Sequence, residues 1–467
     1  MKKYNILWLF IALFSLSACN NFLDIKPVGK VIPTNVDEYR AFLARAYKAI
    51  PSDRGMVNFR SDEMMVRDDE YDKQSYAYLE IWDDNSTLAS NASFDWINYY
   101  SIVYKCNQII EKGRSITLVG DATVSDVDQL IGEAYMLRGY VYYLLVNIYG
   151  QPYTFDGALN SKAVPLILDT DIEKVHSRSL VKDIYASILS DIESARKLIT
   201  KDKWEVIFSY RFNSASVEAF AARMNLYMGN WKESLDAAKK VLSSGYILED
   251  LTKEESKLPN QFESTESIVA LEMVMSSNVT RASIVSEVCQ SWYNEEEDKR
   301  FGKYFSVKEE KVEKEPTHEL EEGEEPEYDI IRTVTPIKGG KNEFSSTFRL
   351  GEFVITAAEA SAQLGMLDEA KGYINQLAAK RYTEEGAKRV STEIAGMTKE
   401  QLIAFIGTER ARELAFEGHR WFDLRRTTRS ELVKVIDGKT YTLKKDDPRY
   451  VVPIPREAIS ANPNLAN

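Results

Sequence analysis

The sequence predicts a mainly α-helical protein, in which paired helices form a scaffold that carries loop-rich insertions and a few short strands. Apolar residues recur at helical spacing in long segments along most of the chain. Two segments, 216–243 and 353–377, each place a glycine between two such stripes, as helical hairpins of tetratricopeptide type do. Hydrophobic residues make up 44% and charged residues 28% of the 467 residues, which is typical of a folded protein.

The N-terminus predicts a lipoprotein signal peptide. Lys2 and Lys3 precede an apolar run over 6–14, which is too short to span a membrane stably. The run ends at Leu-Ser-Ala-Cys, the pattern of a bacterial lipobox whose last residue is Cys19. We therefore expect a signal peptide over 1–18, acyl chains such as palmitate on Cys19, a tether over 19–30 and a single folded body over 31–467.

The helical segments follow in order along the body. Each shows an apolar stripe, and the segment 126–149 is apolar on most of its surface and is followed by Gly150 and Pro152. Because long insertions separate the paired helices, the spacing argues against a continuous solenoid. The expected helical segments are 36–50, 93–112, 126–149, 179–244 (which contains the first hairpin), 350–382 (which contains the second) and a C-terminal helix over 399–426.

Loop-rich insertions are expected mainly at 51–92 and 245–347, with smaller ones at 150–178 and 427–450. The stretch 308–327 is rich in glutamate and is interpreted as a solvated loop, with a cation site as the alternative. Short strands are expected at 267–273 and at 440–443, the second directly after a turn at Asp437 and Gly438.

Composition and missing motifs exclude several function classes. The formal net charge of −13 argues against nucleic-acid binding, which requires a basic face. Three cysteines give neither a disulfide framework nor a paired metal motif, and His318 begins a zinc-protease-like helix that has Glu322 where the second histidine must stand. No phosphate-binding loop, dinucleotide fingerprint or nucleophile elbow is found. We expect no enzyme, no catalytic residue, no cofactor and no metal site.

Several motifs together resemble the SusD/RagB-type outer-membrane lipoproteins, which capture nutrients for TonB-dependent transporters. The most specific is the segment 409–426, ERARELAFEGHRWFDLRR; others are CNNFLD at 19–24, GEAYMLRGY at 132–140, LLVNIYG at 144–150, and PIP at 453–455 followed by NPNL at 462–465. The resemblance covers nearly the whole length and implies four tetratricopeptide-like helix pairs. We pair 36–50 with 93–112 and 126–149 with 179–199, and take the two hairpins as the third and fourth pairs.

The resemblance also implies a function. The protein is expected to be lipid-anchored in the outer membrane, facing the cell exterior, and to bind oligosaccharide or polysaccharide for delivery to a SusC-like, TonB-dependent transporter. Capture of peptide or another nutrient is the first alternative, and a lipoprotein enzyme the second.

By resemblance, the ligand site comes from the loops within the first helix pair and from the insertion after the third. Aromatic rings there cover the apolar face of a sugar, while polar side chains bond its hydroxyls. The alternative for Trp82, a place in the scaffold core, stays open. We expect the fold to bring Trp82, Trp292 and Tyr293 to one exposed surface. The expected ligand-binding residues are Trp82, Trp292, Tyr293, Tyr71, Tyr76, Asn85, Arg60 and Asp62.

The segment 409–426 itself is interpreted as structural. Leu414, Trp421 and Leu424 are spaced to share one face of a helix and are expected in the core. His419 is expected to be a hydrogen-bonded structural residue. The charged side chains are expected to form ion pairs and helix caps within the scaffold: Glu409, Arg412, Glu413, Glu417, Arg420, Asp423 and Arg425.

Overall fold

The computed structural model describes residues 33–52, 54–86, 94–314, 327–339 and 345–466. The predicted signal peptide, Cys19 and the tether lie outside these residues, as does His318. None of the helices in the described part of the chain combines the length and apolarity needed to cross a bilayer.

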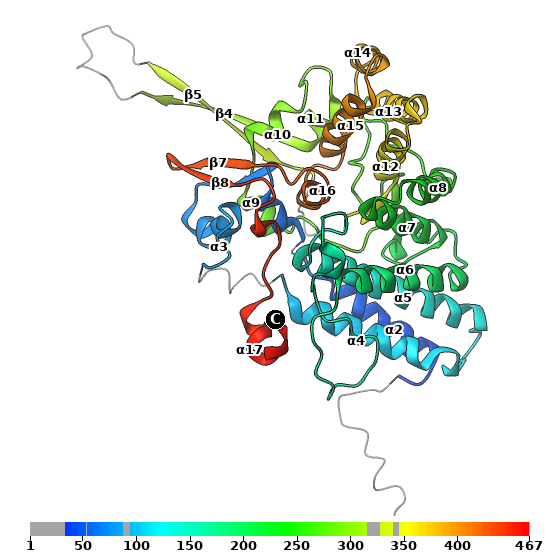
Figure 1. Cartoon of the computed structure of the whole chain (residues 1–467). Helices are drawn as coiled ribbons and strands as arrows, with labels where there is room; N and C mark the ends of the chain where they lie inside the picture. The colour runs from blue at the N-terminus through cyan, green and yellow to red at the C-terminus, as the bar shows by residue number, and fades with distance from the viewer. Residues whose placement is uncertain (1–32, 53, 87–93, 315–326, 340–344, 467) are drawn as a thin grey trace, which may run out of the picture.

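Four helix pairs form the scaffold, and the predicted pairings are confirmed. In each pair the two helices pack directly against each other (Figure 1). The protein is mainly α-helical, as the sequence predicts. The pairs are α2 (Val36–Lys48) with α4 (Trp96–Lys112), α5 (Val124–Tyr149) with α6 (Val181–Leu198), α7 (Ser214–Met228) with α8 (Trp231–Leu242), and α12 (Leu350–Gln363) with α13 (Leu367–Arg381).

The four pairs form a continuous stack, whereas the long insertions between them had argued against one. Helix α4 packs on α5, α6 on α7, and α8 on α12, so successive pairs are neighbours in space. The insertion 245–347 leaves the stack after α8, and the chain re-enters the stack at α12, which packs on α8. Figure 1 shows the stack running from α2 and α4 at its lower end to α12 and α13 at its upper end.

Local sequence fixes the ends of these helices. A capping box joins Thr123 and Asp126 at the start of α5, and a second joins Asn213 and Ser216 at the start of α7. Helix α7 ends at Gly229, whose φ of 74° lies in the left-handed region that glycine adopts without strain. This turn lets α8 fold back against α7.

The prediction of one continuous C-terminal helix over 399–426 is wrong, because the helix is interrupted in its middle. Helix α14 (Glu384–Ala395) leads into α15 (Lys399–Glu413), which stops before α16 (Arg420–Arg426) begins. Phe416 and Gly418, between the two helices, have φ values of 61° and 75°. An α-helix cannot contain such residues, and the backbone N–H of Phe416 instead donates a hydrogen bond to the buried carboxylate of Glu63.

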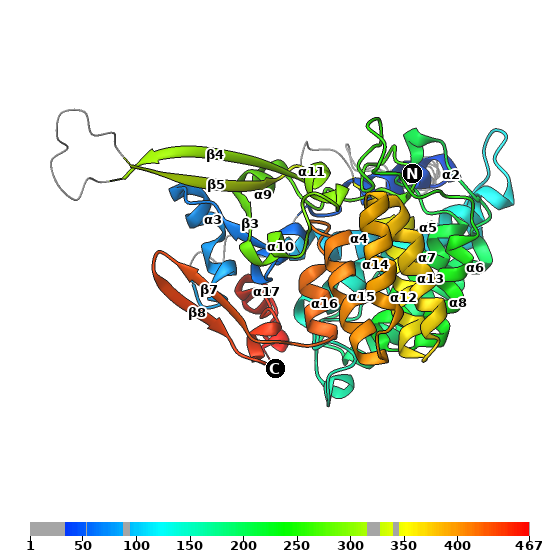
Figure 2. The same cartoon turned by 90° about the horizontal axis from the view of Figure 1, so that it is seen from above.

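A loop-rich region with short antiparallel strand pairs lies beside the scaffold (Figures 1 and 2). The strand predicted over 440–443 is confirmed, whereas the one predicted over 267–273 is present only over 267–269. The pairs are β1 (Met64–Val66) with β3 (Ser283–Val285), β2 (Ser267–Val269) with β6 (Phe348–Arg349), β4 (Phe305–Glu313) with β5 (Tyr328–Pro336), and β7 (Leu432–Ile436) with β8 (Lys439–Leu443). Short helices complete the region: η1 (Arg54–Arg60), α3 (Glu70–Glu80), α9 (Ser277–Ala282), α10 (Glu287–Ser291), α11 (Lys299–Tyr304) and α17 (Arg456–Ala461).

The interpretation of 308–327 as a loop is wrong for its first residues. Residues 308–313 belong to β4, which pairs with β5 along its full length. Both views show this hairpin projecting away from the helices (Figure 2). Residues 315–326, the centre of the glutamate-rich stretch, are not among the described residues.

Candidate functional site

Two predicted site residues of the first insertion, Trp82 and Arg60, are buried. Trp82 is only 1% exposed, and its indole Nε1 donates a hydrogen bond of 2.8 Å to the carbonyl oxygen of Arg60. Arg60 is also fully buried, forms an ion pair of 2.6 Å with Asp84 and lies over the ring of Trp421. The expectation that Trp82 lies on an exposed binding surface is therefore wrong, and its alternative place in the core is the one found. Arg60, which was predicted to line the site, is buried beside it.

The other aromatic residues of the first insertion are also held by the protein itself. Tyr71 is 62% exposed on α3, with the guanidinium of Arg281 over its ring, and half-buried Tyr76 stacks on Phe59. Asn85 is exposed and lines a small cavity of about 260 Å³ beside the C-terminal segment. These residues do not line the larger cavity that contains Trp292.

Asp62 and Trp292 are brought together through Arg420. The guanidinium of Arg420 donates two hydrogen bonds of 2.7 Å to the carboxylate of Asp62 and lies 4.8 Å from the centre of the Trp292 ring. Such bidentate pairs fix the orientation of an arginine, which here is stacked on the indole. The ring is half-buried at the end of α10.

Tyr293 lies beside Trp292 but faces the core. It is 7% exposed, its hydroxyl donates to the carbonyl oxygen of Arg412 at 2.9 Å, and its ring packs on Phe301 and Phe305. Burial raises the pKa of Tyr293 well above its ordinary value. The expected exposed surface of three rings therefore reduces to Trp292 alone.

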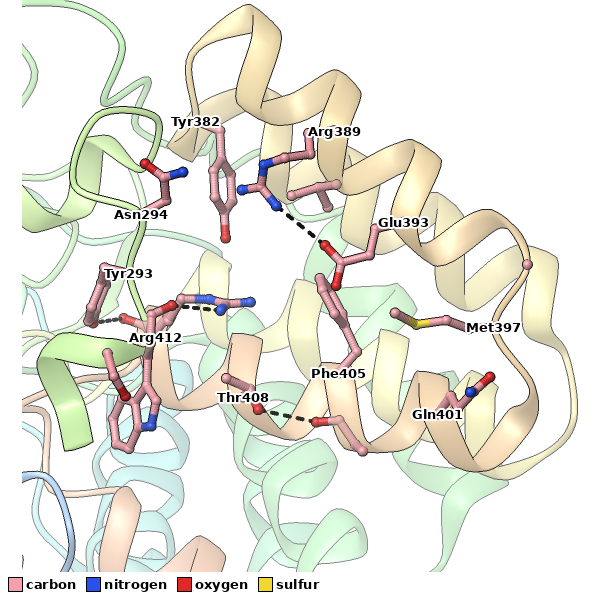
Figure 3. A pocket seen from close by; sticks show the side chains of 15 residues that line it. Tyr293, Asn294, Tyr382, Arg389, Glu393, Met397, Gln401, Phe405, Thr408 and Arg412 are labelled. Atoms are coloured by element: carbon pink, nitrogen blue, oxygen red, sulfur yellow. Dashed lines mark hydrogen bonds and ion pairs between the residues drawn. The ribbon is translucent and has the colours of Figure 1, made fainter.

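Trp292 lines a cavity of about 1040 Å³ between the segment after α10 and the helices α14 and α15 (Figure 3). We call it the Trp292 cavity. Its lining combines aromatic rings with uncharged polar groups, two arginines and the carboxylate of Glu393. The aromatic residues are Trp292, Tyr293, Tyr382 and Phe405; the polar and charged ones include Ser291, Asn294, Arg389, Glu393, Gln401, Thr408 and Arg412.

The wall formed by α14 and α15 was not predicted from the sequence. Gln401, Phe405, Thr408 and Arg412 follow one another at spacings of four, three and four residues, which places them on one face of α15. A polar and aromatic stripe of this kind was a readable signal. Ligand contacts were expected in the insertions, whereas this wall of the cavity is made by regular helices.

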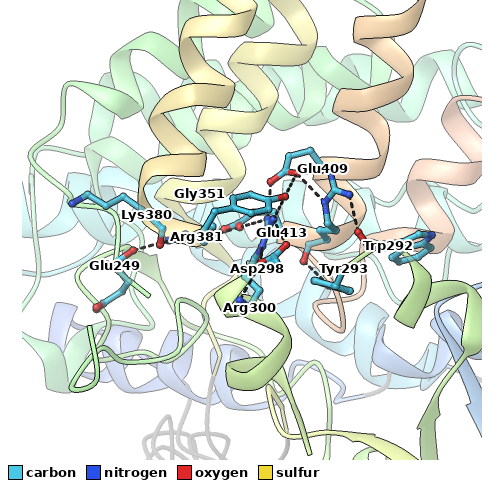
Figure 4. Close-up of polar contacts among 12 residues, drawn as sticks. Glu249, Trp292, Tyr293, Asp298, Arg300, Gly351, Lys380, Arg381, Glu409 and Glu413 are labelled. Carbon is cyan, nitrogen blue, oxygen red and sulfur yellow. Dashed lines mark hydrogen bonds and ion pairs between the residues drawn. The ribbon is translucent and has the colours of Figure 1, made fainter. Parts of the chain in front are cut away.

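A buried network of ion pairs supports the floor of the cavity (Figure 4). Tyr382 donates a hydrogen bond of 2.9 Å to Glu409, which is also paired with Arg412 at 2.7 Å and Arg300 at 2.8 Å. Although burial alone would raise it, the charges of Arg300 and Arg412 lower the pKa of Glu409 to about 2. Tyr382 and Arg412, which face the cavity, are therefore held from below.

Glu413 is the centre of this network. Its fully buried carboxylate accepts hydrogen bonds from Arg349 at 2.7 Å, from Arg381 at 2.8 and 2.9 Å, and from Arg300 at 3.2 Å. Arg349 is the last residue of β6, directly before α12, while Arg381 ends α13 and Arg300 lies in α11. The network therefore ties the fourth helix pair to the loop-rich region, and it includes Glu266, Arg300, Arg349, Arg381, Glu409, Glu413 and Glu417.

Comparison with known proteins gives the family. Residues 21–226 match the protein family described as "Starch-binding associating with outer membrane", and residues 332–467 match the one described as "SusD family". The chain belongs to the SusD/RagB family. Two relatives come from Formosa agariphila: SusD-like protein P38 is 26% identical over 94% of this chain and 95% of its own length, and SusD-like protein P2 is 22% identical over 100% and 99%.

Solved structures of the SusD superfamily have the same fold. One from Bacteroides thetaiotaomicron superposes with a TM-score of 0.73 at 21% identity, covering 92% of this chain and 99% of its own. A SusD-like carbohydrate binding protein from Bacteroides vulgatus gives a TM-score of 0.65 at 16% identity, covering 92% and 97%. At these identities the likeness concerns the fold.

Most side chains of the most specific SusD/RagB motif, 409–426, pack or pair within the protein, although Arg412 also lines the Trp292 cavity. Leu414, Trp421 and Leu424 are buried, although the break between α15 and α16 means that they do not share one helix. His419 is buried as expected, but its Nδ1 atom has no hydrogen-bond partner among the described residues, so the expected hydrogen bond is not found at that atom. Burial, and secondarily the charge of nearby arginines, lowers the pKa of His419 well below its ordinary value. Arg425 donates hydrogen bonds to the carbonyl oxygens of Asn147 and Gly150 and thereby caps the end of α5.

The predicted ion pairs of the motif are present. Arg420 pairs with Asp62, and Asp423 bridges Arg410 and Arg426 at 2.8 and 2.7 Å. Glu417 is paired with Arg349 and Lys338. Within the described residues, no group of three or more histidine, cysteine, aspartate or glutamate side chains is arranged to hold a metal ion.

Proposed function

We propose that this protein captures oligosaccharides or polysaccharides in the Trp292 cavity and delivers them to a TonB-dependent transporter. The observation that carries the proposal is the half-buried Trp292 ring, fixed by Arg420 on the lining of a large, open and partly aromatic cavity. A pyranose ring has an apolar face of C–H groups that an indole covers, and a rim of hydroxyl groups that amides and carboxylates bond. The family description, which names starch binding, and the solved structure described as a SusD-like carbohydrate binding protein support the same ligand class.

Weak binding fits delivery to a transporter. A cavity that contacts only part of a long glycan is expected to bind with a dissociation constant of roughly micromolar to millimolar, about −8 to −4 kcal/mol. The ligand can then leave when the transporter competes for it. The test is calorimetric titration of the chain carrying Cys19→Ala with panels of glycans and of peptides. Binding of glycans supports the proposal, whereas binding of peptides alone contradicts it, and product formation would indicate an enzyme.

The outer-membrane location and the lipid anchor are part of the proposal. The lipobox ending at Cys19 and the family description, which names association with the outer membrane, support them. In cells, Cys19→Ala is expected to move the protein from the membrane fraction to the released fraction. A variant that stays with outer membranes in high salt, in a strain that lacks the transporter, would contradict the anchor.

The transporter partner is the third part of the proposal. A protein that delivers its ligand by covering the mouth of a SusC-like barrel needs a stable interface, above about 2,000 Å² in total. A tagged chain purified from its native membrane in mild detergent is expected to bring a large β-barrel protein with it. Recovery of the chain alone would contradict a stable complex.

A further inference from the structure

We infer that the Trp292 cavity selects uncharged oligosaccharides over those that carry uronate or sulfate groups. The inference rests on the proposed function, because it names the chemical class of glycan that the cavity takes. Its basis is the state of the two arginines that line the cavity. An anionic sugar needs a cation that is free to pair with it, and here both cations already have carboxylate partners.

Each of the three guanidinium nitrogens of Arg412 donates a hydrogen bond within the protein. Its Nε and Nη2 atoms donate to the carboxylate of Glu409 at 2.9 and 2.7 Å, and its Nη1 donates to the carbonyl oxygen of Trp292 at 2.8 Å. Although burial alone would lower it, the charge of Glu409 keeps the pKa of Arg412 above its ordinary value. Arg412 therefore positions Trp292 and presents little uncompensated charge to a ligand.

Arg389 is paired with two carboxylates. Its Nε donates to Glu297 at 2.5 Å and its Nη1 to Glu393 at 3.4 Å. Glu393, one turn along α14, also lines the cavity and is exposed to it. Two acidic groups around one guanidinium leave this side of the cavity negative, so a ligand carboxylate or sulfate placed there meets repulsion.

The remaining polar groups suit hydroxyls. The Oδ1 atom of Asn294 accepts hydrogen bonds from the backbone N–H groups of Glu296 and Glu297, which leaves its amide nitrogen as a donor. The Oε1 atom of Gln401 likewise accepts from the N–H of Thr398 at the start of α15. Amide donors and the Glu393 acceptor match sugar hydroxyls, which both accept and donate hydrogen bonds.

The test uses pairs of hexasaccharides that differ only at C6, with a hydroxymethyl group in one and a carboxylate in the other. One pair is a manno-hexasaccharide and a mannurono-hexasaccharide, and the other is a galacto-hexasaccharide and a galacturono-hexasaccharide. Each is to be titrated into the protein by calorimetry. For any pair that binds, the uncharged member is expected to bind about tenfold tighter or more, and the difference is expected to shrink as salt is added.

The variant Glu393→Gln sharpens the test. Removing one of the two carboxylates around Arg389 is expected to lower the preference for the uncharged member about threefold or more. The matched control is Glu400→Gln, an exposed change in the first turn of α15 that does not touch the cavity lining and is expected to leave the preference unchanged.

Different results would overturn the selectivity and the glycan capture. If the uronate member of a pair binds the wild-type protein as tightly as its neutral partner, the selectivity inference is overturned while glycan capture stands. If Glu393→Gln prefers the uncharged member as strongly as the wild type does, the carboxylates around Arg389 do not cause the selectivity. If no hexasaccharide of either kind and no glycan of the wider panel binds, the proposed function is overturned, and this inference with it.

Discussion

The ion-pair network around Glu413 and the Trp292 cavity above it are built from the same kinds of residue but differ in their access to water. In the network, the arginines and carboxylates are buried and pair with one another and with other groups of the protein. In the cavity, the side chains of Arg389 and Glu393 are 44% and 45% exposed, and the ring of Trp292 is half-buried. Residue type alone therefore does not distinguish a scaffold from a binding surface, whereas burial does.

The same contrast separates the two insertions. Both contain tryptophan among polar residues, and both were expected to contact ligand. Trp82 is enclosed by the core and bonded to Arg60, whereas Trp292 lies at the end of α10 on the cavity lining. The first insertion therefore closes the loop-rich region onto the scaffold, and the second supplies the candidate site.

The largest expected effect is on Glu413. Glu413→Ala leaves Arg349, Arg381 and Arg300 buried without a carboxylate that joins them, and such a loss costs about 3–5 kcal/mol of unfolding free energy. Denaturant unfolding measures it. The matched control is Glu393→Ala, which breaks an exposed ion pair and is expected to cost about 0.5 kcal/mol or less. Equal costs for the two variants would contradict the contrast between network and cavity.

The next effect concerns Trp82. Trp82→Ala removes a ring that is 1% exposed and is expected to cost about 3–5 kcal/mol of unfolding free energy. Glycan affinity of the folded protein is expected to stay unchanged, because Trp82 lies outside the Trp292 cavity. Tyr71→Ala, in the same insertion but 62% exposed, serves as the control and should change stability by about 0.5 kcal/mol or less. A Trp82 variant with intact stability and weakened glycan binding would restore the original expectation.

Glu63 is a buried carboxylate that differs from those of the network, because it accepts a hydrogen bond from the backbone N–H of Phe416. Burial raises the pKa of Glu63 from 4.5 to about 8, although Arg420 and Lys338 oppose this. Because the folded pKa is higher than the unfolded one, the protonated form stabilises the fold fully below about pH 4.5, and this stability is lost as the pH rises to about 8.

Glu63→Gln is therefore expected to gain stability relative to the wild type as the pH rises. Between about pH 5 and pH 8 the difference grows by up to about 1.4 kcal/mol per pH unit, and above pH 8 it increases no further. Denaturant unfolding of both proteins across this range measures the difference. A difference that does not vary with pH would mean that Glu63 is charged in the folded protein.

The smallest effect is expected in the projecting hairpin. Ile330 on β5 is 64% exposed, so Ile330→Thr should change the unfolding free energy by about 0.5 kcal/mol or less. Val334 on the same strand is fully buried, and Val334→Thr is expected to cost about 1–3 kcal/mol, because it buries a hydroxyl group. Similar costs for both would show that the outer part of the hairpin is packed like its base.

The helix pairs could be predicted because an apolar stripe and a glycine turn are local features. Residues such as Gly229 and Thr123 determine their helix ends through near neighbours. The break at Phe416 could not be predicted, because its cause is Glu63, which is distant in the sequence. The burial of Trp82 and Tyr293 likewise depends on contacts with remote segments, and the wall formed by α14 and α15 is brought to Trp292 only by the tertiary fold.

The central claim is that the half-buried ring of Trp292 binds ligand while the enclosed ring of Trp82 supports the fold. Calorimetric binding and thermal melting of Trp292→Ala test this claim most directly. On the scale of base–aromatic stacking, about 1–3 kcal/mol, glycan affinity is expected to fall about 5- to 150-fold, and the melting temperature should fall much less than in Trp82→Ala. A Trp292→Ala protein that binds glycan as well as the wild type, and melts as early as Trp82→Ala, would contradict the account.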